Sequence, residues 1–70
     1  MTPEQLEFEV AMIIADKEAQ GKMAQCDMLE LHRSTGTPTA ELLPLMRYLA
    51  RTGKFVAHIS INKIPILTRQ

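Results

Sequence analysis

The sequence has a single cysteine, three aromatic residues and no net charge. A lone cysteine cannot form a disulfide within the chain or supply a cluster of thiolates for zinc, so Cys26 is predicted to be a small buried apolar residue. With so few aromatic rings, the core must be built from aliphatic and methionine side chains. Nearly half of the residues are hydrophobic, which excludes a disordered chain and predicts one small domain over residues 1–70.

Apolar runs of membrane-spanning length and a basic leader are also missing. Glu4, Glu7 and Glu9 lie where a secretory signal would carry basic residues, so we expect a cytoplasmic protein without membrane contact. His32 and His58 lack the spacing of zinc ligands and are predicted to lie at the surface. We therefore expect no metal site.

Catalytic motifs are absent as well. The sequence contains no nucleophile elbow, no phosphate-cradling glycine loop and no paired-carboxylate site. Gly21, Gly36 and Gly53 each fall at a predicted element boundary, where backbone geometry explains them. We therefore expect a binding protein that is not an enzyme and uses no cofactor.

What the sequence does contain is an uneven distribution of charge. Residues 1–30 carry seven acidic and two basic side chains, whereas residues 31–70 carry six basic side chains and one acidic one. The basic residues of the second part are Arg33, Arg47, Arg51, Lys54, Lys63 and Arg69. Such a division can mark a nucleic-acid-binding face, even when the net charge of the chain is zero.

Residues 3–20 are predicted to form the first helix. Thr2 can cap it, Pro3 suits its first position and Gln5 completes a capping box. One apolar stripe at helical spacing is predicted to face the core: Leu6, Val10, Ile13 and Ile14. A second apolar stripe lies on roughly the opposite side: Phe8, Met12, Ala15 and Ala19. It is predicted to be the dimerisation surface of a homodimer, the alternative being that it extends the core.

Two shorter helices are predicted to follow. An extended segment over residues 22–26 leads into the second helix, which Asp27 and Glu30 begin with a capping box and which ends near Ser34. A dense turn signal separates it from a third helix over about residues 39–52. The apolar face of this third helix consists of Leu42, Met46 and Leu49.

Residues 55–61 and 64–68 are rich in β-branched and apolar residues and are predicted to pair as a β-hairpin. Asn62-Lys63 would be its two-residue turn, since asparagine tolerates a positive φ. Pro65 cannot donate to a β-ladder. Its nitrogen points away from the first strand if Ile61 and Ile64 are the hydrogen-bonded pair beside the turn, so the hairpin is compatible with this proline as long as the segment over residues 22–26 does not reach it.

The order helix, short strand, helix, tight turn, helix and hairpin resembles the winged helix-turn-helix superfamily across the whole chain. Three features support the resemblance, namely the Gly36-Thr37-Pro38-Thr39 turn, the series Leu42, Met46, Leu49 and Gly53, and the Ile61-Asn62-Lys63-Ile64 tip of the hairpin. The resemblance implies a mainly α fold with a small antiparallel β-hairpin, in which three helices form the core and the hairpin is the wing.

In that superfamily the third helix lies in the major groove, and the wing touches the DNA backbone or the minor groove. The resemblance therefore implies a DNA-binding regulator of transcription that contacts double-stranded DNA. By position, the residues that would face the bases are Thr37, Thr39, Glu41, Pro44 and Arg47. Those that would contact phosphates are Arg33, Arg51, Lys54 and Lys63. Tyr48 either hydrogen-bonds a phosphate or closes the core against the hairpin.

The first turns of this third helix depart from a typical recognition helix. They offer Thr39, Glu41, Leu43 and Pro44 in place of the arginine, lysine, asparagine or glutamine side chains that read base edges. An alternative function is therefore docking of a protein partner through Leu43 and Pro44, because a fold does not fix a function. A purely structural or dimerising part of a larger assembly is a third hypothesis.

Overall fold

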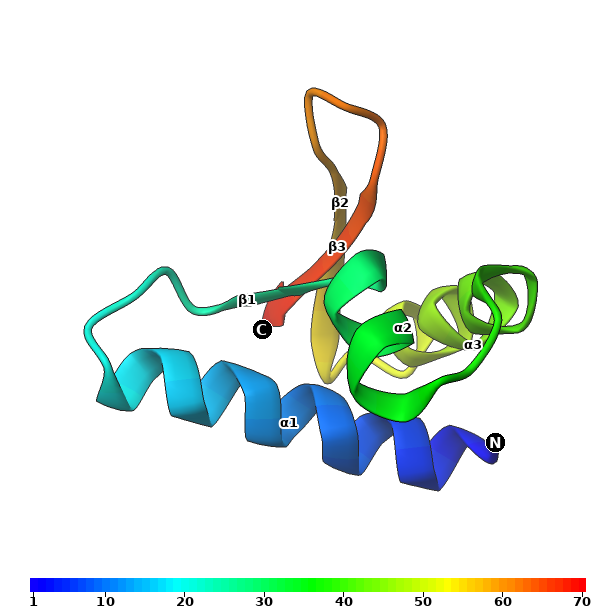
Figure 1. Ribbon diagram of the computed structural model, residues 1–70, viewed down its shortest axis with the longest axis horizontal. Helices are drawn as coiled ribbons and strands as arrows, with labels where there is room; N and C mark the ends of the chain where they lie inside the picture. The colour runs from blue at the N-terminus through cyan, green and yellow to red at the C-terminus, as the bar shows by residue number, and fades with distance from the viewer.

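Residues 1–70 form three helices and a three-stranded antiparallel sheet in a computed structural model (Figure 1). The elements are α1 Pro3–Ala19, β1 Gln25–Asp27, α2 Met28–Thr35, α3 Thr39–Arg51, β2 Phe55–Ile59 and β3 Pro65–Arg69. The predicted helices and hairpin are confirmed. The extended segment before α2 forms part of the sheet, because β1 pairs with β3 and the strand order is β1-β3-β2.

The hairpin formed by β2 and β3 projects away from the helices (Figure 1). α1 runs along one side of the molecule, α3 lies next to the base of the hairpin, and α2 packs against α3 and β1. Four of the five residues of β2 are exposed, so the hairpin has almost no core of its own. Its position therefore depends on how its base is held.

Both capping boxes predicted from the sequence are confirmed. Thr2 Oγ1 accepts a hydrogen bond from the Gln5 amide at 3.1 Å, and Gln5 Oε1 accepts one from the Thr2 amide at 2.8 Å. At the start of α2, Asp27 Oδ1 accepts from the Glu30 amide at 2.8 Å. These bonds satisfy amides that the helix itself leaves without partners.

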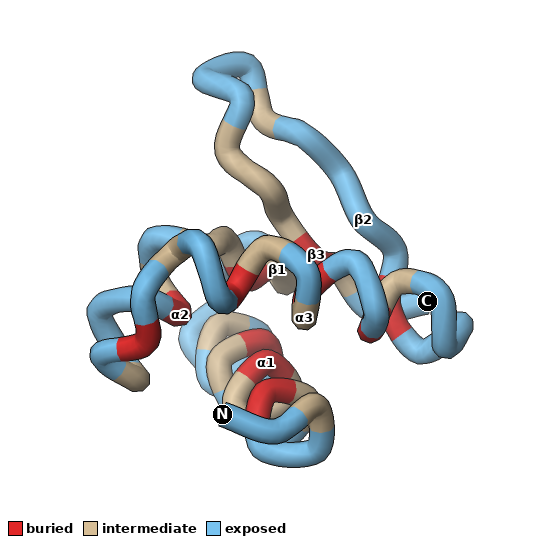
Figure 2. Tube along the Cα trace, turned by 90° about the vertical axis from the view of Figure 1, so that its right-hand side faces the viewer, coloured by how far each residue is buried: buried red, intermediate tan, exposed pale blue.

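The core lies where the three helices meet one face of the sheet. Its buried apolar residues are Leu6, Val10, Ile14, Cys26, Leu31, Leu42, Met46, Leu49, Phe55 and Leu67. The two stripes of α1 are confirmed as a buried face and an exposed face. Figure 2 shows buried segments along the inner side of α1 and at the base of the hairpin, whereas the outer part of the hairpin has none.

Leu67 occupies the middle of the central strand. It lies opposite Cys26 of β1 on one side and opposite Ala57 of β2 on the other. Its side chain is 1% exposed. One strand thus joins the first part of the chain to the hairpin.

The predicted two-residue turn of the hairpin is wrong. The ladder pairs Ile59 with Pro65, and the Ser60 amide donates to the Ile64 carbonyl at 3.0 Å, which leaves a three-residue loop. Lys63 takes the left-handed conformation that such a loop requires, with φ 62°. Ser60 explains why the loop has three residues instead of two, because its carbonyl accepts a hydrogen bond from the Lys63 amide at 2.8 Å and its hydroxyl accepts one from the Ile64 amide at 3.0 Å.

Pro65 fits the sheet although the register differs from the predicted one. Because Ile64 is the residue bonded to the first strand of the hairpin, the nitrogen of Pro65 points to the other side. On that side β1 ends at Asp27, which pairs with Ile66. No strand lies opposite Pro65 there, so the missing amide hydrogen costs no ladder bond.

Lys17 connects the inner side of α1 to two other elements. Its ammonium group donates to the Gln25 carbonyl of β1 at 2.6 Å and to the Glu30 carboxylate of α2. Both charged side chains are largely shielded from solvent. A partly buried charge must be paired in this way, so Lys17 helps to fix how α1 lies against β1 and α2.

Replacing Leu67 should destabilise the fold strongly. We expect Leu67→Ala to lower the free energy of unfolding by about 2–5 kcal/mol, because it leaves a cavity in the middle of the core. Ile61→Ala is the matched control, since Ile61 is 98% exposed at the tip of the hairpin and should change stability by less than about 0.5 kcal/mol. Urea unfolding followed by circular dichroism measures both, and equal effects would contradict this account of the core.

The Cys26 thiol gives a pH-dependent test of the same core. Burial, and secondarily the nearby Glu30 carboxylate, raises the pKa of Cys26 from 9.0 to about 12. Above pH 9 the unfolded chain loses this proton while the folded chain keeps it, so the thiol's contribution to the free energy of unfolding falls as the pH rises from 9 towards 12.

We expect the stability difference between the wild type and Cys26→Ala to shrink between pH 8.5 and 10.5, by up to roughly 1.4 kcal/mol per pH unit. Urea unfolding of both proteins at each pH measures it, and other titrating groups cancel in the comparison. A constant difference would show that the thiol ionises as readily in the folded chain as in the unfolded one.

Candidate functional site

The outer face of α3 changes in character along the helix. Opposite the buried stripe of α3, the exposed residues at spacings of four, three and four are Ala40, Pro44, Arg47 and Arg51. The first half of this face is small and apolar, and the second half is basic. α3 continues through Pro44 without interruption, so both halves belong to one helix.

A shallow hollow of about 190 Å³ lies between α3 and the hairpin. Leu43, Met46 and Arg47 line it from α3. The opposite wall comes from the hairpin: Ala57, His58, Ile59, Pro65, Ile66 and Leu67. Arg47 therefore lies in the corner between the helix and the hairpin, beside a largely apolar surface.

The tip of the hairpin is fully open to solvent. Ile61 is 98% exposed, and Lys63 is exposed on the same three-residue loop. The left-handed backbone at Lys63 is held by the Ser60 bonds of the turn. A lysine is thus presented at the end of the hairpin that lies farthest from the core.

Ion pairs inside the molecule use only some of the basic side chains. Lys17 pairs with Glu30, Lys54 pairs with Glu7 at 3.0 Å, and Arg69 pairs with Glu18 at 3.0 Å. The basic residues that have no carboxylate within ion-pair distance are Lys22, Arg33, Arg47, Arg51 and Lys63. Four of these five come from α2, α3 and the hairpin, so these elements carry most of the uncompensated positive charge.

The structure places two predicted DNA contacts, Tyr48 of α3 and Lys54 of the segment after α3, towards α1. Tyr48 and Lys54 line a separate hollow of about 200 Å³ together with Glu4 and Glu7 of α1. The Tyr48 ring, which is half exposed, lies towards α1, so the hypothesis that it closes the core against the hairpin is wrong. Lys54 donates hydrogen bonds to the Glu7 carboxylate, which neutralises its charge and weakens its attraction for an external phosphate.

Thr37 was also predicted to face DNA, and the structure buries it, with 8% of its surface exposed. Its carbonyl accepts from His32 Nδ1 at 2.8 Å, its amide donates to Thr35 Oγ1 at 3.2 Å, and its hydroxyl lies 3.0 Å from that oxygen. These bonds hold the turn between α2 and α3 together. Thr37 therefore positions the start of α3 and offers no side chain to a ligand.

The other candidate residues of α3 differ in accessibility. Thr39 is half-buried at the first position of the helix, and Leu43 is half-buried in the hollow. Pro44 is exposed on the outer face. Glu41 is exposed, and its carboxylate accepts from the N-terminal amine at 3.1 Å.

Sequence reasoning missed the wall that the hairpin contributes to this site. Ala57, Ile59 and Pro65 face α3 because they share one face of the sheet with the buried residues Phe55 and Leu67. The alternation of side chains along β2, counted from Phe55, is the signal that would have identified this face.

No three histidine, cysteine, aspartate or glutamate side chains gather closely enough to hold a metal ion. None of the helices combines the length and the apolar character needed to cross a membrane. The chain matches no protein family, no curated protein and no solved structure.

Proposed function

We propose that the chain is a winged helix-turn-helix protein that binds double-stranded DNA through the outer face of α3 and the hairpin, which acts as the wing. The order of helices and strands, with β1 added to the hairpin in the strand order β1-β3-β2, supports this fold. The observation that carries the function is the position of three unpaired basic residues. Arg47 lies in the corner between α3 and the wing, Arg51 lies on the next turn of α3, and Lys63 is at the wing tip.

These three side chains suit the phosphate backbone. Arg47 and Arg51 are four residues apart on one helix face, which separates them by roughly 6 Å along the axis. Lys63 extends the positive surface onto the wing. Because no carboxylate of the chain neutralises them, their full charge is available to displace counterions from DNA.

The start of α3 offers contacts from the backbone instead of from long polar side chains. Pro38 caps the helix without a side-chain hydrogen bond, and the amides of Thr39 and Ala40 donate to no other backbone group. Free amides at a helix N-terminus are suited to a phosphate oxygen. Contacts of this kind position a protein on DNA but do not read its sequence, so we propose binding with weak sequence preference.

Removing basic residues of the proposed interface should weaken DNA binding. We expect Arg47→Ala and Lys63→Ala each to lower the affinity for a random-sequence duplex by roughly 3- to 10-fold. Each should also reduce the slope of log affinity against log salt by about 0.9, because one phosphate contact is lost. Fluorescence anisotropy of a labelled duplex at several salt concentrations measures both quantities.

Lys54→Ala is the matched control for Lys63→Ala. It removes the same charge, but from the segment after α3, where Lys54 pairs with Glu7 of α1, so the affinity and the salt slope should stay close to those of the wild type. If Lys54→Ala weakens binding as much as Lys63→Ala does, the charge of the whole molecule drives association and the proposed interface is rejected.

Adding a charge to the same face should strengthen binding. Ala40→Lys places an ammonium group in the uncharged first half of the outer face of α3. We expect it to tighten duplex binding several-fold and to steepen the salt slope by about 0.9. Ala19→Lys makes the same change at an exposed position of α1 and should have little effect on the same titration.

A second candidate function is docking of a protein segment in the hollow between α3 and the wing. The apolar lining of that hollow by Leu43, Ala57 and Ile59 favours it. One measurement distinguishes the two functions. If a duplex does not bind the wild-type chain at 50 mM salt, the DNA proposal is rejected and protein docking remains as the candidate function.

A further inference from the structure

The outer stripe of α1 is an apolar surface that nothing in the chain covers. It consists of Phe8, Met12, Ala15 and Ala19. Phe8 and Met12 are 64% and 52% exposed. The stripe extends over roughly 17 Å along the helix. Large apolar side chains exposed side by side on one helix face are typical of a contact with another molecule.

Acidic side chains flank the outer stripe on both sides. At about 100° per residue, Glu9 and Asp16 fall on one flank and Glu4 falls on the other. None of these three carboxylates has a basic partner in the chain. The outer stripe is therefore an apolar strip between uncompensated negative charges.

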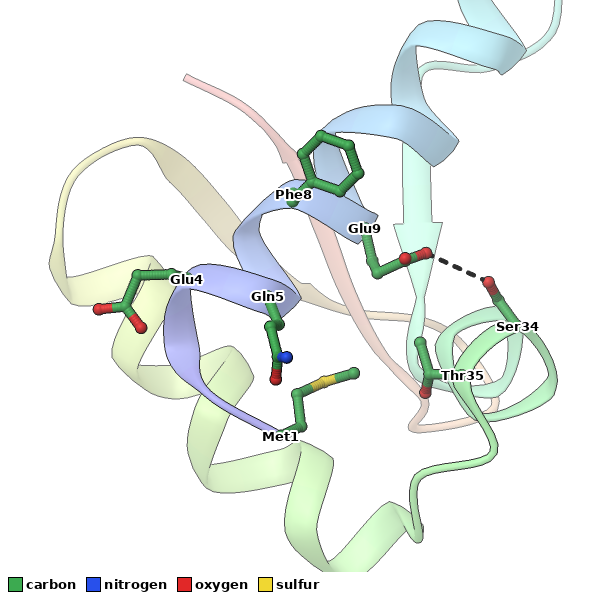
Figure 3. Close-up of a pocket in the computed structure, with 7 residues that line it drawn as sticks. All are labelled: Met1, Glu4, Gln5, Phe8, Glu9, Ser34 and Thr35. Carbon is green, nitrogen blue, oxygen red and sulfur yellow. Dashed lines mark hydrogen bonds between the residues drawn. The ribbon is translucent and has the colours of Figure 1, made fainter.

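The surface is hollowed beside Phe8. An open depression of about 530 Å³ lies between the first turns of α1 and the end of α2 (Figure 3). Figure 3 shows the Phe8 ring between Glu4 on one side and Glu9 on the other, with Glu9 turned towards Ser34, from which it accepts a hydrogen bond at 3.4 Å. A side chain entering this depression would contact the ring and meet carboxylates.

A second copy of the chain is poorly suited to this surface. If two α1 helices packed antiparallel through their outer stripes, the flank with Glu9 and Asp16 would face the same flank of the other copy. If they packed in parallel, that flank would face Glu4 of the other copy. Acidic groups oppose acidic groups in both arrangements, which costs free energy, so the charges disfavour the homodimer predicted from the sequence.

We propose that the outer stripe of α1 docks an amphipathic helix of a partner protein whose apolar face is flanked by lysine or arginine. The basic flanks would pair with Glu4, Glu9 and Asp16, and the apolar face would cover the stripe. The stripe also has a shape that selects side chains. Phe8 and Met12 protrude from it, whereas Ala15 and Ala19 leave room for larger residues of the partner.

Two synthetic helices of about 18 residues test this proposal against the full-length chain. Both carry the same leucine face, and one has lysine at the flanking positions where the other has glutamate. We expect the lysine helix to bind, with an affinity that falls several-fold between 50 and 200 mM salt, and the glutamate helix to bind at least 10-fold more weakly. Anisotropy of the labelled helices provides the affinities.

Variants show whether binding occurs at the outer stripe. Phe8→Ala should weaken binding of the lysine helix at least 10-fold, whereas Met23→Ala, in the exposed loop after α1, should leave it unchanged. The triple variant Glu4→Gln, Glu9→Gln and Asp16→Asn should weaken it several-fold and remove most of its salt dependence. Glu41→Gln on α3 is the control for loss of an acidic charge.

Three results would overturn the proposal. Equal binding of the two helices would show that charge does not select the partner. If the Phe8→Ala variant bound the lysine helix as tightly as the wild type does, the contact would lie elsewhere on the chain. A dimer in sedimentation equilibrium that Phe8→Ala dissociates would make a second copy the occupant. None of these measurements involves DNA, so they stand whether or not α3 and the wing bind a duplex.

Discussion

The pairing of β3 with both of its neighbours is the interaction on which the rest of the structure depends. β1 and α1 belong to the first part of the chain, and α3 and β2 belong to the second. β3 is bonded to both parts, and Leu67 at its centre is buried between Cys26 and Ala57. Because Phe55 is the only buried residue of β2, the orientation of the hairpin is fixed mainly by β3. The position of Lys63 relative to Arg47 is thus set by a core residue of the central strand.

The ion pairs of α1 determine which charged side chains of the molecule remain unpaired. Three of them connect α1 to another element: to α2, to the segment after α3, and to β3. Two of these pairs are exposed, and such pairs contribute little to stability. Their main consequence is the distribution of the charges that remain. Lys17, Lys54 and Arg69 are neutralised by carboxylates of α1 and α2, and four of the five unpaired basic residues lie on α2, α3 and the hairpin. The acidic residues left free on α1 border its outer stripe.

Features that depend on local sequence could be predicted. The capping boxes at Thr2 and Asp27 involve residues three apart, and the two stripes of α1 follow from helical periodicity. Those features were confirmed. The turn of the hairpin was not predicted correctly, because Asn62 suggested a two-residue turn and the decisive bonds come from Ser60, outside it. A side chain that stabilises a turn from its flank leaves no composition signal in the turn itself.

Features that depend on packing between elements could not be predicted from periodicity. Periodicity shows which side of α3 faces the core, but not which flank of α3 faces α1 and which faces the wing. Tyr48 and Arg47 are adjacent in sequence, yet they line different hollows. The prediction that Thr37 faces DNA was wrong for a related reason, because Thr37 is buried by its hydrogen bonds to His32 and Thr35 across the turn.

The two proposed surfaces differ in charge and are separated by the core. The molecule measures 30 × 26 × 25 Å, whereas the Debye length is about 8 Å at physiological ionic strength. The uncompensated acids that border the outer stripe of α1 would therefore be screened from a DNA phosphate bound at the proposed contacts Arg47 and Lys63. At about 10 mM salt the Debye length approaches 30 Å, and the same acids would oppose DNA binding. A basic helix docked on α1 would then reduce that repulsion. The two surfaces would therefore be electrostatically coupled at low salt and would act independently at physiological salt.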